Sequence, residues 1–211
     1  WTKKTARPEH TFQAAISVEI NLFCSRSWRL ARRFAEIRLA LFAEGDATFL
    51  RRVSLDLIGR QPTPEESRAF LQDTRTDKRS RLIDSLLSRP EYVDHWANKW
   101  ADLIRPNPYR VGIKATMNLD HWLRDAFRRN QPYDQMVREM LMAEGAAHRA
   151  GNGATGMLLR DMNMPHDAMA NAVRLFLGTR MECAQCHNHP FDHWTMDDYY
   201  GFAALFARVD Y

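Results

Sequence analysis

The sequence contains few of the residues that define several large classes of protein. Of its 211 residues only three are cysteine, nine are glycine and nine are proline, which excludes a small disulfide-framed domain, a collagen-like fibre and a low-complexity chain. No apolar run approaches the roughly 18 residues that a membrane-spanning helix needs, and the mean hydropathy is -0.51. The sequence therefore predicts a globular chain of one or two domains with no membrane span.

A strong excess of one charge is also missing. Thirty Lys and Arg against 26 Asp and Glu give a net charge of +4, and basic chains can indicate nucleic acid or anionic partners. The densest arginine group alternates with apolar residues at helical spacing, which is typical of the solvated face of an amphipathic helix. We therefore expect no nucleic-acid function. The group consists of Arg26, Arg29, Arg32, Arg33 and Arg38.

Helix signals follow one another along most of the chain. Thr63 supplies an N-cap, followed by Pro64 at the first helical position and a Glu three residues after the cap. Pro90 and Pro165 each begin a further apolar stripe, and Thr195 caps the last one. The stripe after Pro90 is expected to carry four residues on one helix face: Tyr92, Trp96, Trp100 and Leu103. The pattern predicts an all-α fold, a multi-helix, bundle-like domain with long loops.

Two segments depart from this pattern. Residues 16–24 alternate apolar and polar side chains, which predicts a short N-terminal strand, and residues 145–156 are rich in glycine, which indicates a spacer or a mobile loop. We expect residues 1–47 to form a peripheral N-terminal element. Residues 48–211 are then the helical domain.

One short segment holds two of the three cysteines and three of the eight histidines: residues 183–194 read CAQCHNHPFDHW. A CxxCH string is the attachment signal for c-type haem, because its two thiols can add across the two vinyl groups of one porphyrin edge while the adjacent imidazole reaches iron. Cys183 and Cys186 are therefore the predicted thioether residues. His187 is the predicted proximal ligand.

The second axial ligand of such a haem is not determined by the sequence. Methionine in that position raises the reduction potential and histidine lowers it, while an open position would allow small-molecule binding or peroxide chemistry. An electron carrier and a haem enzyme therefore both remain open. The candidates are Met164, His166, His189 and Met196, which are neighbours of the motif in sequence, and His95 and His121 on other helices.

Two other chemistries fit the same segment. Zn could be held by Cys183, Cys186 and His189 together with His187 or His193, although adjacent ligands strain a tetrahedral site. A CxxC pair can also be a redox dithiol, but such motifs normally open a helix beside a parallel sheet, and no sheet is expected here. The third cysteine, Cys24, is expected to be a buried small hydrophobe.

Several stretches of the chain, together with the CxxCHxHPFDxW motif, resemble the planctomycete cytochrome-c-like domain family, a domain of unknown function. The resemblance runs from about residue 48 to residue 209. The resemblance implies an exported domain of a large bacterial multidomain protein. It also implies that Cys183, Cys186 and His187, and no other residues, correspond to the haem-attachment positions of the family. The stretches are 49–66, 81–87, 92–102, 176–180, 183–194 and 198–201.

Haem attachment does not need the residues that continue the motif after His187. We hypothesise that His189 and Asp192 orient the ligand ring or contribute to a metal site. The alternative is a tight turn held by side-chain hydrogen bonds.

The function expected from the sequence is electron transfer by one covalent haem c. The first eight residues lack the basic-then-apolar order of a signal peptide, so we expect an exported protein of the periplasm or cell envelope whose signal peptide has been removed. Its expected partner is a redox protein or a neighbouring domain of the same parent protein. The alternatives are a haem enzyme with an open sixth position and a haem-free structural module held by Zn or a disulfide.

Overall fold

The computed structural model describes residues 45–207, and every regular element in that range is helical, as predicted. The strand expected for residues 16–24 lies outside the described residues. The α-helices are α3 (Asp46–Ile58), α4 (Pro64–Gln72), α5 (Lys78–Leu87), α6 (Pro90–Ile104), α7 (Pro108–Val111), α8 (Ile113–Arg128), α9 (Tyr133–Leu141), α10 (Gly156–Leu159), α11 (Pro165–Ala172) and α12 (Met196–Leu205). Three tighter or wider turns accompany them: the 3-10 turns η1 (Gly153–Thr155) and η3 (Glu182–Gln185), and the π-turn η2 (Val173–Leu177).

The predicted helix starts are confirmed. The Thr63 side chain accepts a hydrogen bond from the Glu66 backbone N–H, and the Glu66 carboxylate accepts one from the Thr63 backbone N–H. Thr195 and Asp198 make the same reciprocal pair at the start of α12. These contacts satisfy backbone donors that a helix leaves free at its N-terminus, which is why local sequence specifies them.

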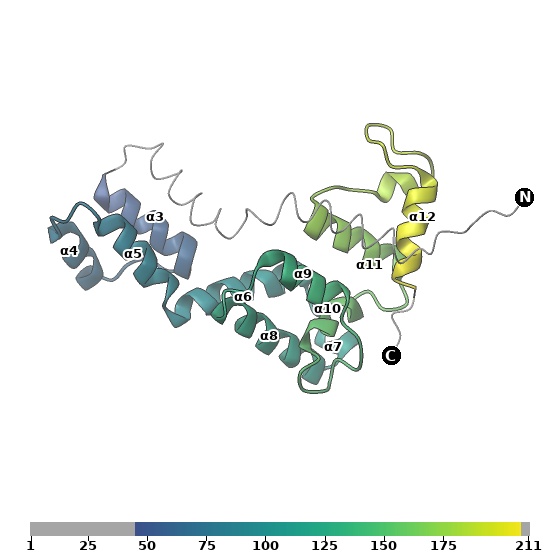
Figure 1. Ribbon diagram of the computed structural model, residues 1–211, viewed down its shortest axis with the longest axis horizontal. Helices are drawn as coiled ribbons and strands as arrows, with labels where there is room; N and C mark the ends of the chain where they lie inside the picture. Colours follow the sequence, from purple (N-terminus) through teal and green to yellow (C-terminus); the bar gives the residue numbers. More distant parts are fainter. Residues whose placement is uncertain (1–44, 208–211) are drawn as a thin grey trace, which may run out of the picture.

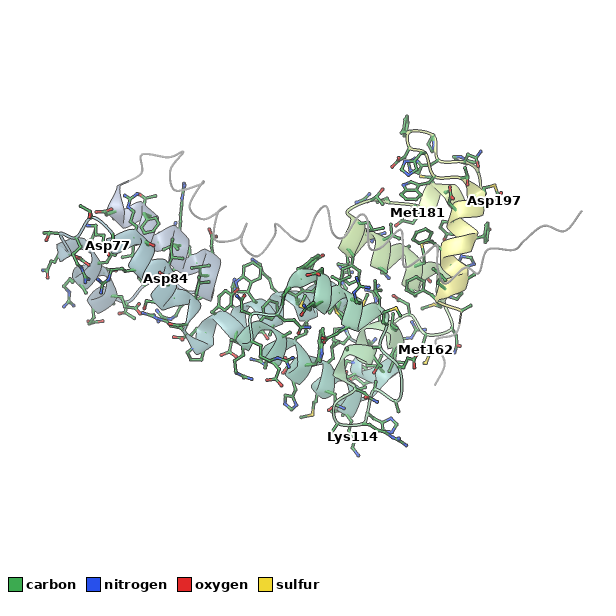
Figure 2. The ribbon with its side chains drawn as sticks, in the orientation of Figure 1. Asp77, Asp84, Lys114, Met162, Met181 and Asp197 are labelled. Atoms are coloured by element: carbon green, nitrogen blue, oxygen red, sulfur yellow. The ribbon has the colours of Figure 1, made fainter. Side chains whose placement is uncertain are left out.

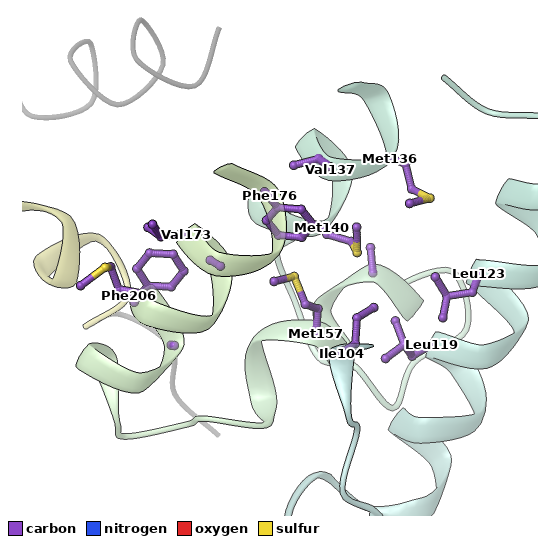
Figure 3. Packing of buried hydrophobic residues seen from close by; sticks show 14 of the residues in the cluster. Ile104, Leu119, Leu123, Met136, Val137, Met140, Met157, Val173, Phe176 and Phe206 are labelled. Atoms are coloured by element: carbon purple, nitrogen blue, oxygen red, sulfur yellow. The ribbon is translucent and has the colours of Figure 1, made fainter. Parts of the chain in front are cut away.

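The helices form an elongated row with two large hydrophobic cores (Figure 1) and one small one. The first core joins α3, α4 and α5 to the beginning of α6, and the second joins the rest of α6 to the helices that follow (Figure 3). The larger core includes Ile104, Leu119, Leu123, Met136, Val137, Met140, Met157, Met169, Val173, Phe176, Met181, Tyr199 and Phe206.

The aromatic stripe of α6 ends on a different residue from the one that the sequence suggests. Tyr92, Trp96, Trp100 and Leu103 were expected on one face, but Leu103 is 50% exposed and Ile104 is buried. At 3.6 residues per turn, Leu103 lies on the same face of α6 as Tyr92, whereas Ile104 lies on the face of Ala97. The larger core packs against the Ala97 face at this end of the helix, so Ile104 is buried and Leu103 is not.

The glycine-rich segment 145–156, for which a spacer or a mobile loop was expected, packs against α8 along both of its halves. Gly153 and Gly156 are buried against α8, and the Asn118 side chain of α8 donates hydrogen bonds to the Ala147 and Arg149 carbonyls. A Cβ atom on Gly153 would lie 2.3 Å from the Asn118 carbonyl oxygen. Glycine is therefore required here for the close approach of two backbones.

Replacing Gly153 by Ala is expected to lower the free energy of unfolding by about 1–3 kcal/mol, because the new methyl group overlaps backbone that cannot give way. Thermal and denaturant unfolding followed by circular dichroism measure the change. Gly201→Ala is the matched control: nothing lies within 4 Å of its Cβ position in α12, so it should be neutral or stabilising. Equal stability of the two variants would contradict the packing described.

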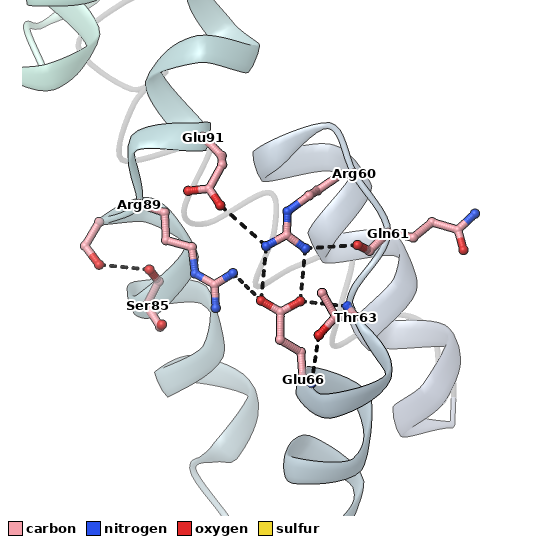
Figure 4. Close-up of polar contacts among 8 residues, drawn as sticks. Arg60, Gln61, Thr63, Glu66, Ser85, Arg89 and Glu91 are labelled. Carbon is pink, nitrogen blue, oxygen red and sulfur yellow. Dashed lines mark hydrogen bonds and ion pairs between the residues drawn. The ribbon is translucent and has the colours of Figure 1, made fainter.

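A network of four charged side chains ties the loop before α4 to the start of α6 (Figure 4). The Glu66 carboxylate accepts hydrogen bonds from Arg60 at 3.0 and 3.1 Å and also from Arg89, and Arg60 reaches Glu91 at 3.4 Å. The Arg60 hydrogen bond is the main cause that lowers the pKa of Glu66 from 4.5 to about 2. The carboxylate therefore stabilises the fold only in its ionised form.

Glu66→Gln is expected to lower the free energy of unfolding at pH 7 by about 1–3 kcal/mol. Because the folded-state pKa is depressed, the stabilisation is fully present above pH 4.5 and is lost as the pH falls towards 2. Chemical unfolding at a series of pH values should therefore show the two proteins converging in acid. Glu65→Gln, whose partner Arg68 is largely exposed, should behave like the parent protein at every pH.

Candidate functional site

The CxxCH segment lies in a loop that projects from the α11–α12 end of the molecule (Figures 1 and 2). Its first part is the 3-10 turn η3, and Cys186 is the residue that ends this turn. Met181 and Ala184 are fully buried in the larger core, whereas Cys183 and Cys186 are exposed. A 3-10 turn has three residues per turn, so positions three apart share a face. The turn therefore presents both cysteines on its outer face while its inner face anchors it.

Both thiols are free. Cys183 and Cys186 are not joined by a disulfide, and each side chain is exposed to solvent. This arrangement allows a ligand to approach the two sulfur atoms from outside the protein.

Two contacts from neighbouring elements hold the turn in place, and the sequence analysis predicted neither. The Tyr200 hydroxyl on α12 donates a hydrogen bond to the Gln185 carbonyl at 3.1 Å. Arg174 in η2 forms an ion pair with Glu182 at the start of the turn. The partners are 15 and 8 residues apart, so the sequence carries no local signal for either contact.

His187 follows the turn directly and is exposed. Its Nδ1 atom lies 2.7 Å from the Asn188 carbonyl oxygen, a contact that favours a proton on Nδ1 and leaves Nε2 as the unprotonated nitrogen. The Asn188 side chain in turn accepts a hydrogen bond from the Met196 backbone N–H at 3.1 Å. The imidazole is therefore oriented by a segment that is tied to the start of α12.

The rest of the motif forms a tight turn. The His189 backbone N–H donates to the Trp194 carbonyl at 2.8 Å, and the His189 ring accepts from the Phe191 N–H at 3.3 Å. Asp192 accepts from the His193 backbone N–H and lies 2.8 Å from the His193 ring, and that backbone hydrogen bond is the main cause that lowers the pKa of Asp192. These are the contacts expected of the tight-turn alternative. A role of His189 and Asp192 towards a metal stays a prediction.

Of the candidate sixth ligands, Met164 and His166 lie together at the start of α11. The His166 ring stacks on Tyr199 with centroids 5.6 Å apart and meets the edge of Tyr200 at 5.5 Å, and its buried Nδ1 atom has no hydrogen-bond partner. Burial, followed by the nearby charge of Asp167, raises the pKa of Tyr199. Met164 is the partly buried residue that precedes the helix. Only one aromatic ring therefore separates His166 from the CxxC turn.

The more distant histidines lie elsewhere. The His95 ring packs over Gly59, whose positive φ of 69° brings it so close that a Cβ would lie 2.3 Å from the ring. His121 lines a recess between α6 and α8. Each therefore belongs to a different part of the row of helices.

The zinc alternative has no convergent set of ligands in the described part of the chain. Within residues 45–207, no group of three or more His, Cys, Asp or Glu side chains is arranged to hold a metal ion. Two surface recesses, one beside Ile104 and Met157 and one between α6 and α8, are lined by residues outside the motif. Cys183 and Cys186 are exposed to solvent.

Fold and site together define an all-helical domain that presents a CxxCH turn at one end. The chain belongs to the family PSCyt2, described as a protein of unknown function (DUF1549), whose model matches residues 33–211. The match confirms the resemblance at the level of the domain family, and it begins 15 residues before the boundary expected at residue 48. No curated protein and no solved structure matches the chain. None of the described helices is long and apolar enough to cross a membrane.

Tyr200→Phe is expected to increase backbone hydrogen–deuterium exchange in residues 183–187 about two- to fivefold, because one hydrogen bond to the turn is lost while the ring stays in place. Exchange followed by mass spectrometry measures the effect. Tyr109→Phe makes the same chemical change at a side chain that is 98% exposed and should leave that segment unaffected. Unchanged exchange in Tyr200→Phe would contradict the anchoring role.

Proposed function

We propose that this domain binds one c-type haem covalently and transfers electrons. Cys183 and Cys186 would form the thioether bonds, and His187 would supply the axial ligand. The observation that carries the proposal is the common outer face of the two free, exposed thiols on η3, followed at once by an exposed imidazole.

The local hydrogen bonding of His187 supports the same assignment. A histidine that binds a metal through one ring nitrogen commonly donates the other N–H to a carbonyl or carboxylate, which fixes the tautomer and the orientation of the ring. In this chain the Asn188 carbonyl lies 2.7 Å from Nδ1, so Nε2 is the nitrogen that would face iron. When bound, the haem would supply one-electron chemistry. The protein's contribution is to hold the two sulfur atoms and the imidazole on one anchored turn.

The second axial position stays between Met164, His166 and an open site. His166 has a ring nitrogen without a partner, which supports its candidacy, but its ring would have to leave the stack with Tyr199 to reach iron. An open site is the basis of the alternative function, a haem enzyme for peroxide or another small oxidant. Absorption spectra of the oxidised and reduced protein distinguish the three cases.

Location and partner follow from the haem proposal. Covalent haem attachment takes place outside the bacterial cytoplasm, so we place the protein in the periplasm or cell envelope. Its partner would be a redox protein or a neighbouring domain of the same parent protein. Phe191, 94% exposed in the same loop as the motif, would offer such a partner an apolar contact beside the cysteines.

Expression of the chain with a cytochrome c maturation system tests the haem proposal. Intact mass should increase by one haem per chain, and the haem should survive denaturation. The double variant Cys183→Ser/Cys186→Ser should lose the covalent haem completely, and His187→Ala should keep the attachment but change the absorption spectrum. Cys24→Ser is the control for loss of a thiol outside the motif and should retain both properties.

Two results of that experiment would overturn the haem proposal. An unmodified mass with one zinc per chain by elemental analysis would establish the zinc alternative. An unmodified mass with no metal would instead support a structural module in which Cys183 and Cys186 remain a dithiol or form a disulfide.

A further inference from the structure

Exposed apolar side chains concentrate at one corner of the molecule, away from the CxxCH loop. Nine large hydrophobic residues are exposed in the described chain, and four of them fall within residues 103–117. They are Leu103 (50% exposed), Tyr109 (98%), Ile113 (70%) and Met117 (54%). They lie at the end of α6, on α7 and on the first turns of α8, a region that we call the α7 corner.

The exposed side chains of the α7 corner are not required by its packing. Val111 and Ala115 are buried with Ala147 in a small core of their own. Ile113 and Met117 are four residues apart, so they share a face of α8, and that face is exposed. The corner is therefore already packed on its inner side, and its outer apolar side chains are available to a partner.

Most of the charged side chains around these residues are basic: Arg105, Arg110 and Lys114 are exposed. The nearest acidic residues in sequence are Asp102 and Asp120, and Asp120 forms an ion pair with Arg124. Two of the basic residues directly follow an exposed apolar residue in sequence. The α7 corner therefore combines apolar side chains with flexible cations whose charged ends can spread to the side.

A recess continues the apolar surface of the corner. It has a volume of about 300 Å³ and opens between α6 and α8 beside Met117. Its walls include the apolar residues Ala101, Pro106 and Met117 and the polar residues Thr116, Asp120 and His121, and its floor is formed by the buried Leu119 and Leu123. Ala101 and Pro106 are partly exposed and extend the apolar surface beyond the four side chains.

We propose that the α7 corner binds the surface of a bilayer that contains anionic phospholipid. Peripheral binding of this kind combines apolar side chains that enter the headgroup region with basic residues that attract the anionic lipid, and neither contribution is sufficient alone. Tyrosine is favoured at the membrane interface because its ring is apolar and its hydroxyl polar. Contact through a few inserted side chains requires no membrane-spanning helix.

The shape of the corner favours a lipid surface over a protein partner. Tyr109 is 98% exposed, so its ring projects almost free of neighbours from a four-residue helix. The central contacts of a protein interface usually lie in packed, flat or concave surfaces. In Figures 1 and 2, α7 and Lys114 lie at the lower edge of the molecule, and the CxxCH loop before α12 lies well apart from them at the top. A bound bilayer would therefore leave the motif accessible.

Co-sedimentation with lipid vesicles tests the proposal on the complete 211-residue chain without haem, so that its outcome is independent of the proposed function. We expect binding to vesicles of phosphatidylcholine with roughly one-third phosphatidylglycerol, weaker binding in high salt, and little binding to pure phosphatidylcholine.

Tyr109→Ser/Ile113→Ser should weaken binding to anionic vesicles about tenfold. Arg105→Gln/Lys114→Gln should produce a similar loss at low salt, and in high salt this variant and the parent chain should bind equally. Leu71→Ser, at a residue 49% exposed on α4, is the matched control and should bind like the parent chain.

Three outcomes would overturn the membrane proposal. The parent chain could fail to bind anionic vesicles, or the Tyr109→Ser/Ile113→Ser variant, folded by circular dichroism, could bind them equally well. The parent chain could also sediment as a dimer that this variant converts to a monomer, which would make the α7 corner an interface between two copies.

Discussion

Helix α6 belongs to both hydrophobic cores, and the arrangement of the whole molecule depends on it. Tyr92 near its start is buried in the first core, Ile104 at its end is buried in the second, and Trp96 packs against both. At 3.6 residues per turn, Ile104 lies about a third of a turn around the helix from Tyr92, with Trp96 between them, so the two cores meet neighbouring faces of α6. The Arg124 side chain of α8 then binds Asp94 of α6, which holds the two longest helices together. A single helix with a continuous apolar stripe thus joins the two cores into one row.

The helical period also decides which residues of the CxxCH turn are buried and which are exposed. In a turn with a three-residue period, Met181 and Ala184 share one face, which is buried, and Cys183 and Cys186 share another, which is exposed. The same three-residue spacing therefore anchors the turn through its buried residues and exposes both cysteines together. Tyr200 and Arg174 add contacts from α12 and η2. The chemistry proposed for the site depends on this outward presentation, because both thiols must reach one ligand.

How well the sequence predicted the fold depends on how local each signal is. The starts of α4 and α12 are correctly predicted because their capping boxes act within four residues. The burial of Gly153 is missed because it depends on the approach of Asn118, which lies far away in sequence. The exposure of Leu103 is misjudged by one position, since residues 103 and 104 are both apolar and only the direction of the stripe separates them. Periodicity identifies a helix more reliably than it identifies the last buried residue.

The sequence by itself determined the all-helical class, the helix starts and the residue types of the CxxCH segment, because caps, periodicity and motif spacing act over a few residues. Only the tertiary structure decided which side of the turn faces outward, which side chains hold it and which apolar residues at the α7 corner remain uncovered. Exposure depends on what packs opposite a residue, and the hydrogen bond from Tyr200 to Gln185 spans 15 residues. Such contacts are set by the packing of whole helices, which no short stretch of sequence specifies.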